Sequence, residues 1–146
     1  MALDAASPQE RVEQLIVLTE RLTGMMRRET EAFEAHRGHE VLAGSAELAR
    51  LANLYRHESL KIRRDPTLVS AAEPGLRRKL IEATREFDSA LARHGRAVEA
   101  AKVVTEGLVK AIAEEITAQR SSGAGYGPGA VGRETGATAV TLNRRA

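Results

Sequence analysis

The residues best suited to bind a metal ion are the two histidines of the segment His36-Arg37-Gly38-His39-Glu40. Histidines at positions i and i+3 of a helix can face the same side, and a nearby carboxylate such as Glu40 could add a ligand. The segment does not match the His-Glu-x-x-His pattern of zinc enzymes, and spacing fixes no third ligand. We therefore expect no metal site and interpret the histidines as part of a polar break between helices.

Patterns typical of catalytic sites are missing from the sequence. Without cysteine there is no thiolate nucleophile, disulfide or zinc–thiolate site. No serine lies in a Gly-x-Ser-x-Gly pattern, and the glycine-rich segment 123–129 lacks the Gly-Lys-Ser/Thr ending of a phosphate-binding loop. Glu114 and Glu115 lie among solvated helix positions, where nothing prepares a carboxylate for acid–base catalysis. We expect a protein that is not an enzyme and that uses no cofactor.

Two groups of basic residues flank the middle of the chain. Lys61, Arg63 and Arg64 precede the turn-forming residues 65–75, and Arg77, Arg78 and Lys79 follow them. A helical hairpin would bring both groups to one tip, where an acidic partner or nucleic acid could bind. No aromatic residue lies among them, and the first 120 residues hold 19 basic and 19 acidic side chains. We expect a solvated tip and no binding of nucleic acid.

Length and composition indicate one soluble domain. The chain has 146 residues, of which 42% are hydrophobic, 29% charged and only 3% aromatic, so it has few rings with which to build a deep pocket. The apolar run Leu15–Leu18 is too short for a signal-peptide core or a membrane span. We expect a cytoplasmic protein with no membrane insertion.

Turn-forming residues divide the sequence into two helical stretches and a tail. Ser7-Pro8 is a helix start signal, and Asp65-Pro66 ends the first stretch, which we predict over 8–64 with a break near 36–40. The second stretch is predicted over 76–119. Residues 121–146 hold six glycines and little apolar area, and we expect them to be a flexible tail after a helical body of residues 1–120.

Apolar residues recur at heptad spacing in both stretches. The second stretch carries the clearer line: Leu80, Thr84, Phe87, Leu91, His94, Val98, Ala101, Thr105, Leu108 and Ile112. The first stretch has two runs that differ in register across the break. We predict an all-α fold, either an elongated antiparallel helical hairpin or a three-helix bundle, with coiled-coil-like seams. Two helices alone cannot bury both seams, so a third helix, a partner or self-association must cover the rest.

Three features resemble the FlgN-type family of flagellar export chaperones. The first is the opening helix with Leu15, Leu18, Leu22 and the segment Glu29-Thr30-Glu31-Ala32-Phe33. The second is the late helix Val103–Ala113, and the third is the glycine-rich segment Gly125-Tyr126-Gly127-Pro128-Gly129 that follows it. The resemblance covers most of the chain in layout.

The resemblance implies a small cytoplasmic helical protein that escorts the hook–filament junction proteins of the flagellum. The late helix of such chaperones holds the C-terminal helical segments of the clients, as in helix-in-groove recognition. On the heptad line we predict client binding by Leu91, Val98, Leu108 and Ile112, with Val104 and Ile116 beside them; the alternative for each is a place in the intramolecular core. The tail tyrosine of the family docks on the cytoplasmic domain of the export gate, and Tyr126 matches it. A coiled-coil scaffold or regulatory adaptor without an export role is the alternative.

Overall fold

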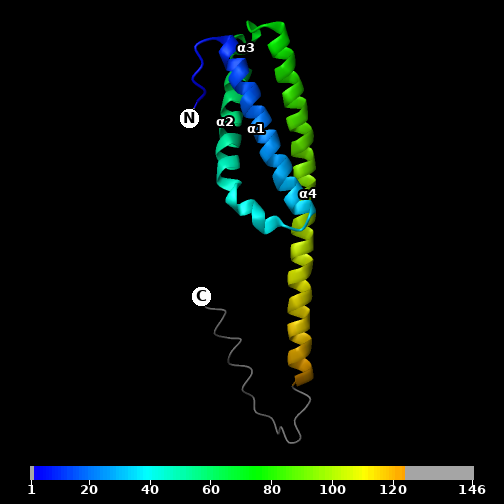
Figure 1. Cartoon of the computed structure of the whole chain (residues 1–146). Coiled ribbons are helices and arrows are strands. Elements are labelled where there is room, and N and C mark those ends of the chain that lie inside the picture. Colours follow the sequence, from blue (N-terminus) through cyan, green and yellow to red (C-terminus); the bar gives the residue numbers. More distant parts are fainter. Residues whose placement is uncertain (1, 124–146) are drawn as a thin grey trace, which may run out of the picture. The chain divides into compact units, whose positions relative to one another are not determined.

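The computed structural model describes residues 2–123, and in that range all its regular elements are helices (Figure 1). They are α1 (Pro8–Glu34), the 3-10 helix η1 (Gly38–Ala43), α2 (Ser45–Arg64), α3 (Thr67–Ser70) and α4 (Pro74–Gly123). The chain divides into two compact units at Thr105, and each is described by itself. In the first unit, α1, α2 and the α4 residues up to 105 form a three-helix bundle. The predicted all-α fold is confirmed, and of the two predicted arrangements the bundle is the correct one.

The start of α1 is fixed by its cap. The Ser7 hydroxyl oxygen accepts a hydrogen bond from the Glu10 amide at 3.1 Å, and Pro8 occupies the first turn. The Glu10 carboxylate accepts from the Ala6 amide at 2.9 Å, so amides on both sides of the cap have partners. Ser7 and Pro8 predicted this helix start from the sequence.

The end of α1 explains the break near 36–40. The Arg37 amide donates to the Ala32 carbonyl at 2.7 Å, and the His36 amide donates to the Phe33 carbonyl at 3.1 Å. Together with the positive φ of His36, 58°, these bonds form a Schellman motif, in which the left-handed residue is usually glycine. Gly38 then passes close to the Phe33 ring, because a Cβ there would lie 3.2 Å from it. The chain turns from α1 into η1 and returns along α2.

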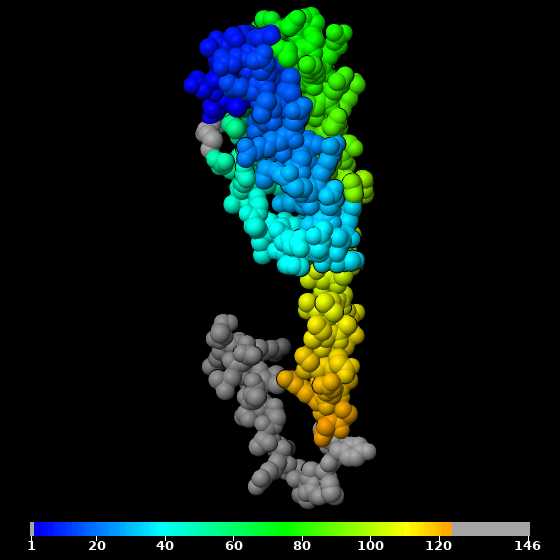
Figure 2. Space-filling view, viewed as in Figure 1, coloured from blue at the N-terminus to red at the C-terminus, as the bar shows by residue number. Residues whose placement is uncertain are grey.

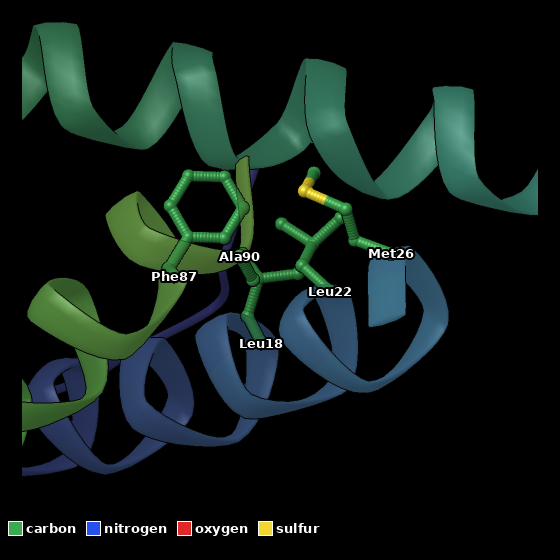
Figure 3. Close-up of a cluster of buried hydrophobic side chains, with 5 residues drawn as sticks. All are labelled: Leu18, Leu22, Met26, Phe87 and Ala90. Carbon is green, nitrogen blue, oxygen red and sulfur yellow. The ribbon is translucent and has the colours of Figure 1, made fainter. Parts of the chain in front are cut away.

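The core of the bundle lies where the three helices meet. Figure 3 shows the Phe87 ring of α4 among the α1 side chains Leu18, Leu22 and Met26, next to Ala90. The Tyr55 ring of α2 packs against Phe87 with the ring centroids 4.8 Å apart. α1 supplies most of the buried residues among residues 2–123, and Figure 2 shows its outer side, in blue, on the surface of the first unit. α1 is therefore the central helix of the core.

The buried line of α4 departs from the predicted seam on both sides of Phe87: Ala83 is buried in place of Thr84, and Thr105, Leu108 and Ile112 of the seam are exposed. Phe87 is buried as predicted, but the next buried residues are Ala90 and Ala97, and Leu91 and Val98 are exposed. The buried line still has heptad spacing, with steps of three and four taken in the other order. Alanine lets two helix backbones approach closely, so the small side chain occupies the contact and the larger neighbour lies outside it.

A buried carboxylate joins three segments of the bundle. Glu58 of α2 is fully buried, and its carboxylate accepts hydrogen bonds from Arg11 Nη1 at 2.8 Å and from the Leu3 amide at 3.1 Å. Lys61 Nζ lies 3.7 Å from the same carboxylate. Charged partners offset the cost of burying this acid, which ties the N-terminal segment and α1 to α2.

The connection between α2 and α4 is short and hydrogen-bonded. Asp65 ends α2, and its carboxylate accepts from the Thr67 amide at 3.1 Å, which starts α3. The Glu73 amide donates to the side-chain oxygen of Gln9 at 3.1 Å, linking the start of α4 to the start of α1. Among residues 2–123, no helix has the length and apolar character needed to cross a membrane.

Candidate functional site

Three of the six predicted client-binding residues lie on the bundle portion of α4. Leu91 is 46% exposed, Val98 38% and Val104 56%, so none of them belongs to the core. Ala90 and Ala97 take the buried positions beside Leu91 and Val98. Large aliphatic side chains left in water at helical spacing form a surface that can bind a partner.

The other three predicted residues lie in the separate segment of α4 formed by residues 106–123. Leu108 is 60% exposed, Ile112 51% and Ile116 46%, and Val109 beside them is 61% exposed. The spacing i, i+4, i+8 places the three predicted residues on one side of the helix. In this segment every described residue is exposed, so these side chains have no intramolecular cover among residues 2–123.

Polar side chains cover the side of segment 106–123 that lies opposite the apolar stripe. Lys110 Nζ lies 4.0 Å from the Glu114 carboxylate, a pair one turn apart. The Thr117 hydroxyl donates to the Ala113 carbonyl at 2.9 Å, and the Ser121 hydroxyl donates to the Thr117 carbonyl at 2.9 Å. The segment is thus an amphipathic helix with an apolar stripe and an opposite polar side.

A polar contact of His94 and an ion pair of Arg93 hold α4 against the last turns of α1. His94 Nε2 lies 3.1 Å from the Glu29 carboxylate, both side chains are largely buried, and the Phe33 ring meets the His94 ring edge-on at 6.2 Å. Arg93 makes two hydrogen bonds to the Glu34 carboxylate, at 3.0 and 2.5 Å. These bonds lower the pKa of Glu34 and raise that of Arg93.

The two histidines of the break lie beside a hollow. His36 and His39 line a space of about 390 Å³ together with Phe33, Val104 and Thr105. In the part of the chain that the structure describes, no three histidine, cysteine or carboxylate side chains come together as they would around a metal ion. His36 and His39 therefore belong to the connection between α1 and α2, at the edge of the bundle.

The six basic residues near the turn do not share one environment. Lys61 lies near Glu58, and Lys79 lines a hollow of about 550 Å³ with Glu20, Glu82 and Glu86. Arg63 and Arg64 are exposed at the end of α2, and Arg77 and Arg78 are exposed at the start of α4. Nearby carboxylates therefore partly offset the charge of this end.

Two residues lie beyond what the sequence and the structure could be compared on: one lies outside the described residues, and the other was not predicted. Tyr126, predicted to dock on the export gate, lies outside the described residues. Glu58 was missed, although a signal existed: it lies three residues after Tyr55 and four before Ile62, on the apolar side of the helix. An acid at such a position needs a buried partner, and Arg11 is the partner found.

Comparison with known proteins gives one informative match. No family model matches the chain, and no solved structure matches it. A relative from Caulobacter vibrioides is 50% identical over the full length of both chains, and its description is that of a flagellar basal-body protein. Identity at this level over whole chains shows common descent, so this protein belongs to a family of flagellum-associated proteins. The relative is FlbY, and the chain belongs to the FlbY family. The flagellar association predicted from the sequence is confirmed, and the export-chaperone function stays a prediction.

Proposed function

We propose that this protein is a cytoplasmic export chaperone without catalytic activity that holds the C-terminal helical segments of the flagellar hook–filament junction proteins. The observation that carries the proposal is the apolar stripe Leu108, Ile112 and Ile116, exposed on a helix whose other side is polar. Such a stripe is the half-site of a helix-in-groove or helix-on-helix interface. Membership of a flagellar family supports the choice of client.

The burial of these side chains would supply the binding free energy. Each aliphatic side chain contributes about 1.5–3 kcal/mol when it moves from water into a packed contact. Leu91, Val98 and Val104 are further exposed contacts, offered by the bundle portion of α4. Delivery follows when Tyr126 engages the cytoplasmic domain of the export gate, an aromatic anchor of a kind common in protein interfaces.

Calorimetric titration with C-terminal peptides from the junction proteins of the same organism tests this proposal. We expect one-to-one binding with a negative heat-capacity change, the signature of apolar burial. Leu108→Glu should weaken binding by at least about tenfold, because a buried charge replaces a buried side chain. Thr117→Glu is the matched control, since it adds the same charge on the polar side of the same segment.

Three outcomes would contradict the proposal or its site assignment. A folded protein that releases no heat with any junction-protein peptide would remove the chaperone function. Equal losses from Leu108→Glu and Thr117→Glu would remove the stripe as the binding site. Deletion of residues 124–146 should spare peptide binding and abolish docking on the export gate, so a loss of peptide affinity would contradict this division of roles.

A coiled-coil scaffold of the basal body is the second candidate, favoured by the description of the FlbY relative as a basal-body protein. A homo-oligomer would bury the same stripe without any client. Sedimentation equilibrium separates the two candidates. A monomer that binds peptide supports the chaperone, and a stable oligomer that Leu108→Glu dissociates supports the scaffold.

A further inference from the structure

Helix α2 has an excess of positive charge that its own carboxylates do not balance. It holds five basic residues, Arg50, Arg56, Lys61, Arg63 and Arg64, against Glu47 and Glu58. Both acids are already engaged, because Glu58 is buried against Arg11 and Glu47 forms an ion pair with Arg21 of α1. The solvent side of α2 is therefore left with cations alone.

These cations gather on one side of the helix. Seven exposed residues recur at helical spacing on the side opposite Glu58, and we call them the α2 arginine face: Arg50, Asn53, Arg56, His57, Leu60, Arg63 and Arg64. None of the seven is acidic. From its first to its last residue the face is roughly 21 Å long at 1.5 Å per residue, about four turns of helix.

The four guanidinium groups of this face are free to bind a ligand. Within residues 2–123 none of them takes part in an ion pair, and Arg56 makes one hydrogen bond, to Asn53 at 3.3 Å. Arginine recognises carboxylates by paired, planar hydrogen bonds, and its guanidinium loses hydration more easily than an ammonium does. The face thus favours a partner that offers several carboxylates in a row.

An apolar seat lies within the basic face. Leu54 and Leu60, with Arg50, Asn53, Arg56 and His57, line a hollow of about 510 Å³ on α2. Leu60 is 44% exposed, although a leucine on an otherwise polar helix face costs free energy in water. A partner with an apolar side chain between its acids would fill the hollow and pair the arginines at once.

We propose that the α2 arginine face binds an acidic amphipathic helix of a partner protein, with an apolar side chain in the hollow and carboxylates on Arg50, Arg56 and Arg63. This surface is separate from the apolar stripe on α4 and does not depend on the proposed chaperone function. It adds a second contact, held by charge, to a protein whose first proposed contact is apolar.

Other ligands fit the face less well. A lipid surface needs several large apolar side chains to insert, and Leu60 is the one large apolar residue among the seven. A single-stranded nucleic acid is held by basic residues combined with aromatic ones, and the face has no aromatic apart from His57. Residues 124–146 of this chain carry three arginines and one glutamate, so their charge has the wrong sign.

Fluorescence anisotropy with the full-length protein tests the proposal. The probe is a labelled 20-residue peptide with glutamate and leucine at helical spacing. We expect binding that weakens as salt is added and that falls at least about tenfold in Arg56→Glu/Arg63→Glu. The matched control is Arg85→Glu/Arg96→Glu, which changes the charge equally at exposed positions of α4 and should bind normally. A scrambled peptide of the same composition should bind more weakly.

Several results would overturn the proposal. The proposal is wrong if the unmodified protein does not bind the peptide, or if Arg56→Glu/Arg63→Glu binds it as tightly as the unmodified protein does. It is also wrong if Arg85→Glu/Arg96→Glu weakens binding as much as Arg56→Glu/Arg63→Glu does. Tighter binding of phosphatidylglycerol vesicles or duplex DNA, dependent on Arg56 and Arg63, would assign the face to another ligand. Self-association that this variant abolishes would assign it to a second copy. Should the glutamate variant fail to fold, Arg56→Gln/Arg63→Gln replaces it and should still weaken binding.

Discussion

Leu15, Leu18 and Leu22 of α1 are 3%, 6% and 0% exposed, and Leu108, Ile112 and Ile116 of α4 are 60%, 51% and 46% exposed. Both sets are aliphatic side chains that recur every three or four residues on one side of a helix. The first set lies in the bundle and the second in the segment 106–123. The same pattern therefore provides folding free energy in one region and an open surface in the other.

The difference teaches how such a helix divides its roles. Eleven of the 27 residues of α1 are buried, so most of its pattern is used inside the molecule. None of the residues from 106 to 123 is buried, so their pattern contributes little to the stability of the free protein. Substitutions in the segment can then alter binding without unfolding the bundle.

The largest expected effect compares one residue from each set. Leu22→Ala should lower the free energy of unfolding by about 3 kcal/mol, because it leaves a cavity in the core. Ile112→Ala should change it by less than about 0.5 kcal/mol, because its side chain is already in water. Urea unfolding followed by circular dichroism measures both. Comparable losses would show that Ile112 is packed in the free protein and would break the comparison.

A smaller effect separates neighbours within α4. Ala90→Leu should cost about 1–3 kcal/mol, because Ala90 is 6% exposed and a larger side chain does not fit the helix contact. Leu91→Ala should cost less than about 0.5 kcal/mol. The same unfolding measurement applies to this pair. If Leu91→Ala proved the costlier change, the seam predicted from the sequence would be the real one.

The smallest effect is a dependence on pH at the edge of the bundle. Arg93 lowers the pKa of Glu34 from its ordinary value of 4.5, so the pair stabilises the fold above that pH. Its contribution is lost as pH falls through the lowered pKa of Glu34. Unfolding of Arg93→Gln and of the unmodified protein should therefore differ slightly at neutral pH and converge in acid. A difference that persists in acid would point to packing of the Arg93 chain instead.

The sequence predicted elements better than contacts. Ser7, Pro8 and Pro66 act on their own neighbours, so the bounds of α1 and α2 were within reach, as was the break that begins at Ala35. The choice of Ala90 over Leu91 depends on how closely two helices approach, and periodicity carries no such distance. α4 runs from Pro74 to Gly123, beyond the predicted 76–119, and in its last turn the Ser121 and Ser122 hydroxyls donate to the carbonyls of Thr117 and Gln119.

The candidate site was predicted in part for the same reason. The aliphatic residues of α4 were identified as a stripe, and their exposure could be learned only from the packing of α1 and α2. The α2 arginine face was missed because its basic residues were considered as a tip with Arg77 and Arg78. The unbalanced positive charge of α2 becomes clear only when Glu47 and Glu58 are known to pair with Arg21 and Arg11 of α1.

The carboxylate of Glu58 also fixes the register of the bundle. A leucine-lined contact between helices tolerates sliding, since one leucine replaces another after each turn of about 5.4 Å. A slide of α1 along α2 by one turn would separate Glu58 from Arg11 and from the Leu3 amide, and would leave a charge buried without partners. One acid thus selects a single alignment from several that apolar packing alone would accept.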